Sequence, residues 1–274
     1  GKGTDYQLDT SYDSPDAGEE KTVSGIVKLL CKDFVFDDGT EAGTSEKGFT
    51  LTGKINKATI DLNSIRLEQY VFNDLEKTYE IELKTLLDDI LSRQKPAGVT
   101  YGQIEYPKGV KELHFTDNAY HVDMAVMSGS TLNLPIAAAN SSKGEIGTVT
   151  VTIKTTNYQD FELTLHIIAQ DKIVPTLDGT ASATEITYGQ TLADSELTVT
   201  GTMKHPGTGE EVKGTFTWTD GAIKPKAGDY ETEWTFTPGE GYEEYAVATG
   251  TVTVKVSKAQ LQDVSVLVPN TYYY

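Results

Sequence analysis

The four histidines are the residues of this chain best suited to bind a metal ion: His114, His121, His166 and His205. A zinc site needs several such side chains that converge on one point. His114 and His121 with Asp123 give only an H-x6-H-x-D spacing. His121 and Asp123 would share one face of a strand, but no helix brings His114 beside them. We therefore expect no metal site, and interpret the histidines as exposed strand or loop residues.

Adjacent carboxylates could bind calcium or serve as the acid and base of a glycosidase. The pairs are Asp37-Asp38, Asp88-Asp89, Glu210-Glu211 and Glu243-Glu244. A calcium loop spaces its ligands as D-x-[DN]-x-[DN]-G, which does not occur in this sequence. Glycosidase carboxylates need a cleft that small β-modules do not form. We interpret the pairs as solvated charges, and calcium bound loosely at a module boundary stays open.

The motifs of nucleophilic and phosphate chemistry are missing from the sequence. There is no G-x-S-x-G, since the segment 127–130 lacks the first glycine, and no G-x-x-x-x-G-K-[ST]. The single cysteine, Cys31, lies in an apolar run without a neighbouring His or Arg, which is typical of a buried or half-buried thiol. We expect a protein that is not an enzyme and needs no cofactor.

Aromatic side chains are the remaining candidates, because sugar-binding modules stack rings on pyranose faces. Trp218 and Trp234 alternate in register with the apolar residues of their strands, which favours the core. Tyr242 and Tyr245 lie on a loop before the last strand and are the weak binding candidates of this sequence. A tyrosine packed at a corner of the fold explains them equally well.

Charge excludes two classes of partner. The chain has 274 residues with 41 acidic and 23 basic side chains, a net charge of −18. It offers no basic face for nucleic acid and no attraction to an anionic membrane. No apolar stretch of about 18 residues is present, so no membrane insertion is expected. Neither end carries a signal peptide or a polar tail, and we interpret both as cuts in a longer polypeptide.

Strict alternation of apolar and polar residues predicts an all-β fold. It occurs in the runs 147–154, 161–167, 214–219, 230–236 and 251–256, separated by turn signals such as Asn157-Tyr158 and Asp220-Gly221. Many short strands at this spacing are typical of antiparallel sandwiches. One segment differs: residues 84–93 carry leucines and an isoleucine at helical spacing and are followed by Lys95-Pro96-Ala97-Gly98, which predicts a short helix.

Internal similarity predicts the module boundaries. The run 147–153 is echoed by 250–256, and Asn56-Lys57-Ala58 is echoed by Ser257-Lys258-Ala259. Pro175 interrupts the pattern after residue 171, since proline cannot donate within a central strand. The sequence therefore predicts modules at 1–58, 59–171 and 172–258, the second with the short helix, and the start of a further module at 259–274.

These segments resemble tandem bacterial Ig-like repeats. Residues 180–258, with Thr187-Tyr188-Gly189-Gln190, Gly228-Asp229-Tyr230 and the closing Val256-Ser257-Lys258-Ala259, resemble the MBG repeat. Residues 12–58 resemble the later half of the YDG repeat, whose opening strands would lie before residue 1, and residues 59–171 resemble a spacer module of the same proteins. The resemblance implies an extracellular protein linked to the cell wall of a Gram-positive bacterium.

From the pattern and the resemblance together we expect a stalk, spacer or adhesive surface without catalysis. A carbohydrate- or mucin-binding module is the alternative. The expected partner is a host glycan or protein, and the chain is expected to be a monomer. A Lys–Asn isopeptide bond in place of disulfides stays open.

Overall fold

The computed structural model describes residues 5–39, 46–94, 100–139 and 141–261. It divides the chain into two compact units, Gly1–Gln170 and Asp171–Tyr274. Strands dominate both units, which confirms the predicted all-β class. The predicted boundary at 171–172 lies beside the division between the units, whereas the one at residue 58 lies inside the first unit. Most of the predicted further module, 259–274, lies outside the described residues.

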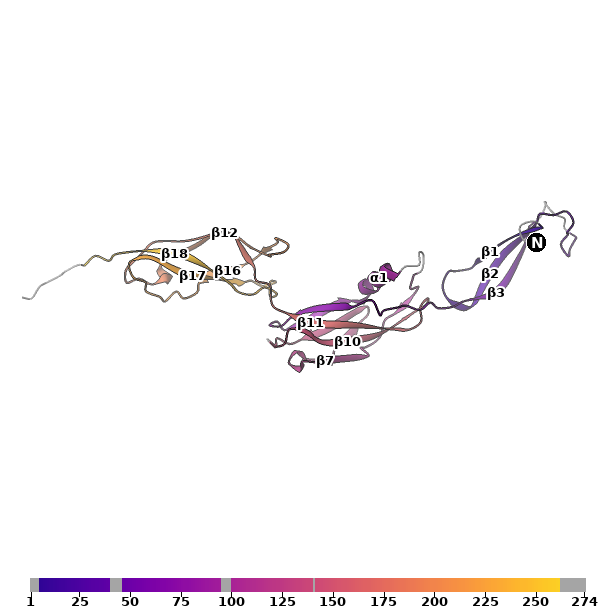
Figure 1. Ribbon diagram of the computed structural model, residues 1–274, viewed down its shortest axis with the longest axis horizontal. Helices are drawn as coiled ribbons and strands as arrows, with labels where there is room; N and C mark the ends of the chain where they lie inside the picture. Colours follow the sequence, from indigo (N-terminus) through magenta and orange to yellow (C-terminus); the bar gives the residue numbers. More distant parts are fainter. Residues whose placement is uncertain (1–4, 40–45, 95–99, 140, 262–274) are drawn as a thin grey trace, which may run out of the picture. The chain divides into compact units, whose positions relative to one another are not determined.

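The first unit begins with a three-stranded antiparallel sheet (Figure 1). Its strands are β1 (Tyr6–Tyr12), β2 (Gly18–Leu29) and β3 (Glu46–Ile55), in that order. Because side chains alternate between faces, the register places Leu8, Val27 and Leu29 on one side. Few of its residues are fully buried, and Leu51 is 61% exposed. This sheet therefore contributes little core of its own.

The rest of the first unit is a two-sheet sandwich with a helix. One sheet has the order β4 (Leu67–Phe72), β11 (Phe161–Gln170), β10 (Gly144–Thr155) and β6 (Ile104–Glu105), and β7 (Glu112–Phe115) also pairs with β10. The other has the order β5 (Lys77–Glu82), β9 (Thr131–Ile136) and β8 (Val126–Ser128). β4 runs parallel to β11, while the other pairings are antiparallel. A 3₁₀ turn, η1 (Asn118–Tyr120), connects β7 to β8.

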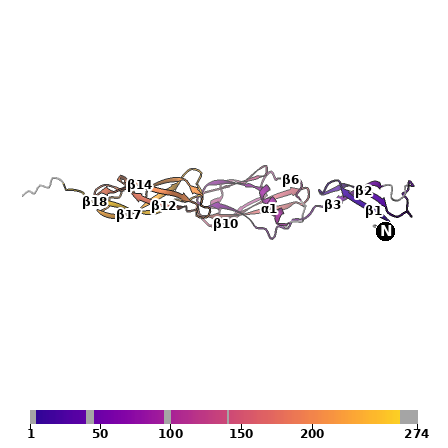
Figure 2. The same cartoon turned by 90° about the horizontal axis from the view of Figure 1, so that it is seen from above.

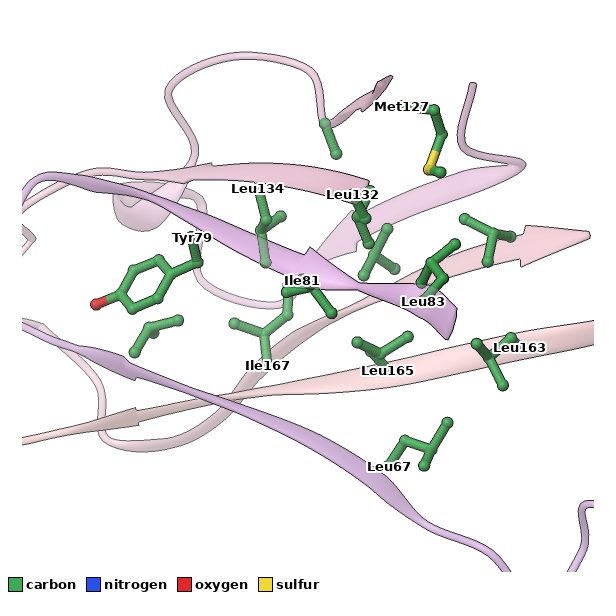
Figure 3. Close-up of a cluster of buried hydrophobic side chains, with 14 of the residues drawn as sticks. Leu67, Tyr79, Ile81, Leu83, Met127, Leu132, Leu134, Leu163, Leu165 and Ile167 are labelled. Atoms are coloured by element: carbon green, nitrogen blue, oxygen red, sulfur yellow. The ribbon is translucent and has the colours of Figure 1, made fainter. Parts of the chain in front are cut away.

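The core of this sandwich forms between the alternating inner faces of its two sheets. Figure 3 shows Ile81 and Leu134 of the smaller sheet pointing toward Leu165 and Ile167 of β11. Leu132, Leu134 and Ile167 are completely buried. Burial of each such side chain contributes on the order of 1.5–3 kcal/mol, so this core stabilises the unit substantially.

The helix α1 (Leu83–Gln94) confirms the short helix predicted near 84–93. Leu83, Leu87 and Ile90 are completely buried and lie at the spacing of one helical face. The hydroxyl of Tyr101 donates a 2.9 Å hydrogen bond to the carbonyl of Leu87. Apolar packing and this buried hydrogen bond together fix the helix to the sandwich (Figure 1).

The second unit is a sandwich of the immunoglobulin-like kind (Figure 2). One sheet has the order β12 (Thr176–Ala183), β14 (Leu197–Lys204) and β15 (Glu211–Val212). The other has the order β13 (Ile186–Thr187), β18 (Ala248–Ser257), β17 (Gly228–Pro238) and β16 (Gly214–Trp218). A 3₁₀ turn, η2 (Leu192–Asp194), precedes β14. All five alternating runs of the sequence fall in strands: β10, β11, β16, β17 and β18.

Aromatic rings in both units lie over glycines of a neighbouring strand. Trp234 stands opposite Gly250 in the β17–β18 register, and a Cβ built on Gly250 would overlap the indole ring. Phe49 covers Gly25 in the same way. The ring replaces the side chain that the glycine lacks, which restores packing on an otherwise weak strand position. The indole Nε1 of Trp234 is buried without a hydrogen-bond partner in the described residues, so this ring is held by packing alone.

We predict that Gly250→Ala destabilises the second unit by about 1–3 kcal/mol, because the new methyl group must displace the indole ring of Trp234. Gly239→Ala is the control, since its Cβ would approach no heavy atom closer than 3.4 Å. Both tryptophans lie in this unit, so tryptophan fluorescence during urea unfolding reports on it alone. Equal midpoints for the two variants would contradict the packing role of Gly250.

Tyr101 gives the first unit a specific sensitivity to alkaline pH. Burial, with smaller contributions from Tyr158 and Asp88, raises the pKa of Tyr101 above its usual 10. The neutral phenol is favoured in the folded state, so its contribution is complete below pH 10 and is lost as pH rises toward the folded-state pKa. Tyr101→Phe should cost about 1 kcal/mol at pH 7 through the lost hydrogen bond. Its stability should then fall less steeply between pH 10 and 11 than that of the wild type, as measured by urea unfolding followed by far-ultraviolet circular dichroism. Parallel slopes in this range would contradict the assignment.

Candidate functional site

A joint in the first unit ties the three-stranded sheet to the sandwich, and we call it the Asn157 joint. It consists of Asp16, Ala17, Lys57, Ala58 and Asn157. The Asn157 side-chain oxygen accepts a 2.8 Å hydrogen bond from the backbone N–H of Ala17. Its amide nitrogen donates to Asp16 Oδ1 at 2.9 Å and to the carbonyl of Thr100 at 3.0 Å. Asn157 is only 9% exposed, so both ends of its side chain serve these contacts.

Backbone hydrogen bonds complete the joint. The N–H of Ala58 donates to the carbonyl of Asn157 at 2.7 Å, and the N–H of Gln159 donates to the carbonyl of Ala58 at 2.8 Å. These bonds make a parallel bridge between Ala58 and Tyr158. Lys57 Nζ adds a 2.7 Å bond to the carbonyl of Thr155. The chain that leaves β3 is thus paired with the sandwich as soon as it reaches it.

The turn between β10 and β11 positions Asn157. The Thr155 hydroxyl accepts a hydrogen bond from the N–H of Tyr158 at 2.9 Å and donates one to the carbonyl of Tyr158 at 3.2 Å. These two bonds close the turn. Gly102 packs against the turn with a φ of +67°, and a Cβ there would come within 2.8 Å of Thr156. Only glycine combines this backbone conformation with so close an approach.

The joint borders a cleft, and its polar side chains bond to other parts of the chain. A cleft of about 230 Å³ lies beside it, lined by Pro15, Ala17, Ile55, Asn56, Ala58, Thr100 and Asn157. The only carboxylate of the joint, Asp16, accepts the hydrogen bond from Asn157. Lys57 donates to a backbone carbonyl, so it is not placed to attack an amide of Asn157. The joint can therefore hold two parts of the chain together, and the isopeptide bond left open above is not indicated here.

The histidines occupy separate parts of the fold. His114 lies exposed on β7, and His166 lies half-buried on β11. His205 accepts hydrogen bonds at Nδ1 from the N–H groups of Gly207 and Thr208. The expectation that His121 and Asp123 share a strand face is wrong, because the chain that follows η1 leaves the sheet and forms no strand at these residues. Within the described residues no three His, Cys, Asp or Glu side chains converge as a metal site.

The aromatic candidates lie at the edge of the core of the second unit. Tyr245 is 9% exposed and contacts the rings of Tyr242 and His205, with centroids 6.0 and 5.9 Å apart. Burial raises the pKa of Tyr245. Tyr242 is half-buried and packs against the same core. Stacking of Tyr242 or Tyr245 on a sugar stays a prediction, but the structure shows both rings engaged in packing.

Tryptophan packing follows the sequence pattern. Trp234 is 5% exposed in the core, while Trp218 packs at its margin and donates from Nε1 to the carbonyl of Ser195 at 2.9 Å. Both therefore face the interior side of their strands, as predicted.

Two of the four adjacent carboxylate pairs form ion pairs at the surface. Lys47 pairs with both Asp37 and Asp38, and its hydrogen bond lowers the pKa of Asp37. In α1, Asp88 pairs with Lys84 and Asp89 with Arg93, at 2.6 and 2.7 Å. Exposed pairs of this kind contribute little stability and are typical of solvated faces.

The thiol of Cys31 is half-buried, as predicted. Its Sγ lies 3.3 Å from Asp33 Oδ2, within hydrogen-bond distance of that carboxylate.

Comparisons with known proteins identify no family. No family model and no curated protein matches the chain. Among solved structures it is similar to the human desmocollin-1 ectodomain, at 12% identity and a TM-score of 0.25, covering 90% of this chain and 46% of that one. It is similar to mouse cadherin-23 EC22-24 at 10% identity and a TM-score of 0.23, covering 93% and 86%. It is similar to the insect immune protein hemolin at 10% identity and a TM-score of 0.24, covering 94% and 71%.

These comparisons leave the function to be argued from the chain itself. The chain spans less than half the length of the desmocollin-1 ectodomain. Within the part of the chain that the structure describes, no helix has the length and apolar character needed to cross a membrane.

Replacing Tyr245 distinguishes packing from ligand binding. We predict that Tyr245→Ala lowers the unfolding free energy of the second unit by about 3 kcal/mol, because it empties a buried ring position. Tyr188→Ala is the matched control, since Tyr188 is 56% exposed, and it should change stability by less than about 0.5 kcal/mol. Tryptophan fluorescence in urea measures both. If Tyr245→Ala changes the unfolding free energy only slightly, the packing role is contradicted and Tyr245 remains a candidate for ligand binding.

Proposed function

We propose that this chain is a non-catalytic spacer segment of an extracellular modular protein attached to a bacterial cell wall, which extends or presents an adhesive surface toward a host glycan or protein. The observation that carries the proposal is the Asn157 joint. Only Asn56 and Lys57 lie between the end of β3 and Ala58, which is already bridged to Tyr158. A spacer needs connections that resist bending, and this one has almost no linker.

The joint resists bending because movement would break several hydrogen bonds together. Each bond contributes about 0.5–1.5 kcal/mol net, and loss of a buried partner costs more. The side chain of Asn157 bonds to Asp16 and Ala17, and the backbone of Ala58 bonds to Asn157 and Gln159 of the same turn. A hinge at this position would leave the buried amide of Asn157 without its bonds to Asp16 and Ala17.

Composition fits a monomer that folds without disulfides, and the repeat resemblance is what supports its place outside the cell. The chain has one cysteine and therefore forms no intramolecular disulfide, so its sandwiches depend on packed cores. A net charge of −18 gives neighbouring copies mutual repulsion. The sequence lacks nucleophile and phosphate-binding motifs, which supports a function without catalysis. The resemblance to MBG and YDG repeats supports attachment to a Gram-positive cell wall.

Distances between two spin labels, measured across the Asn157 joint by double electron–electron resonance spectroscopy, test the proposal. Spin labels on Lys28→Cys in β2 and Glu112→Cys in β7, in the full chain with Cys31→Ser, should give a narrow distance distribution. Asn157→Ala should broaden it, because three side-chain hydrogen bonds are lost. Asn157→Asp should broaden it too, since a carboxylate replaces the donor that faces Asp16.

Asn118→Ala is the control, because Asn118 is exposed in η1. Circular dichroism establishes that every variant is folded. A wild-type distribution as broad as that of Asn157→Ala would refute a stiff joint and with it the spacer.

A further inference from the structure

A network of polar side chains crosses the outer face of the larger sheet in the first unit, and we call it the Arg66 cluster. It consists of Arg66, Glu68, Tyr70, Glu145 and His166. Arg66 donates from Nε to Glu68 Oε1 at 2.8 Å and from Nη2 to Glu145 Oε2 at 2.7 Å. His166 Nδ1 lies 2.9 Å from Glu145 Oε1, and the Tyr70 hydroxyl donates to Glu68 Oε2 at 2.7 Å.

Strand register brings these residues together. His166 of β11 stands opposite Glu68 of β4 and opposite Thr148 of β10. Their neighbours Leu67, Leu165 and Ile167 are buried in the core, so alternation turns Glu68 and His166 outward. Glu68, Tyr70 and His166 thus lie on paired strands, and hydrogen bonds hold the side chains of the cluster before any ligand arrives.

The carboxylates of the cluster outnumber its guanidinium group. Hydrogen bonds from Tyr70 and Arg66 lower the pKa of Glu68, and those from Arg66 and His166 lower the pKa of Glu145. Both carboxylates are therefore ionised at neutral pH around a single guanidinium. An anionic ligand would meet two negative groups and no unpaired cation of the cluster.

A cleft of about 440 Å³ opens beside the cluster, between residues 62–67 and 162–166. Its polar side chains are Asn63, Ser64, Arg66, Glu162, Thr164 and His166. Glu162 is neutralised by its ion pair with Lys111. Among the described residues His166 Nε2 has no hydrogen-bond partner, and the ring lines the cleft. The volume lies in the usual range for small-molecule sites.

We infer that this cleft binds a neutral saccharide. Sugar hydroxyls both donate and accept, and the cleft offers the N–H groups of Arg66 and His166 beside the acceptor oxygens of Asn63, Thr164 and Glu162. Glu145 lies outside the lining and holds the Arg66 and His166 side chains in place. Tyr70 follows Glu68 by two residues on the same face, about 7 Å along the strand. Tyr70 does not line the cleft itself, but it is 49% exposed on the adjoining sheet face, which leaves apolar ring surface there for a pyranose face. This site rests on the glycan-binding part of the proposed function and names its ligand class, and it does not depend on the spacer role.

Screening the full chain on an array of neutral glycans and their sialylated counterparts tests the inference. We expect binding to neutral glycans and at least tenfold weaker binding to the sialylated ones. Titration of the best neutral glycan into ¹⁵N-labelled chain should then shift the amide signals of residues 62–67 and 162–166. No binding to any neutral glycan, stronger binding to the sialylated forms, or shifts confined to other regions would each overturn the inference.

Variants assign the binding to this cleft. Arg66→Lys keeps the charge but loses the two-pronged contact with Glu68 and Glu145, and Tyr70→Ala removes the exposed ring. Each should weaken binding at least tenfold, and Tyr188→Ala, which removes an exposed tyrosine in the second unit, should leave it unchanged. Unchanged binding in both cluster variants would overturn the assignment. The spin-label distances of Arg66→Lys should match the wild type, so failure of the spacer and failure of the sugar site are separable.

Discussion

The pairing of the last two long strands in each unit is the interaction on which the rest of that unit depends. β10 pairs with β11 and β17 pairs with β18 along nearly their whole lengths, and each hairpin presents one apolar face. That face needs a cover, which the opposing sheet supplies. In both units a short early strand then adds parallel to the last one, β4 to β11 and β13 to β18, and extends the hairpin sheet. The order of the strands in each unit follows from the need to cover the apolar face of the hairpin and to extend its sheet.

Packing against the hairpins explains features that are costly in isolation. Gly250 weakens a strand that otherwise alternates threonine and valine, yet it admits the ring of Trp234. The indole N–H is buried without a partner in the described residues, which costs about 1–3 kcal/mol. Apolar contact over the large ring surface offsets that cost. The three-stranded sheet has the same device at Gly25 and Phe49 but buries few side chains, so its position depends more on the Asn157 joint.

The sequence predicted what local periodicity encodes. Alternation located the strands β10, β11 and β16–β18, and helical spacing located α1, because each signal lies within one element. The glycine–aromatic contacts were missed because they depend on register between strands. Asn157 was visible only as a turn signal, since its partners Asp16 and Ala17 lie 141 and 140 residues away. The Arg66 cluster joins β4, β10 and β11, and no spacing within a single strand indicates it. The wrong strand assignment at His121 arose because an i, i+2 pair fits any extended chain.

A sandwich with both inner faces committed to a core has only outer faces, edges and connections on which to place function. In the first unit the connection is the Asn157 joint, and the Arg66 cluster is a hydrogen-bonded polar network on an outer face. Neither contributes to the core between the sheets, so each can change without emptying it. Residues such as Leu165 and Ile167 hold the sheet to which the cluster is attached, and their loss would affect stability before recognition. Separation of this kind allows a sandwich to vary its outer surfaces while the paired hairpin that defines it stays the same.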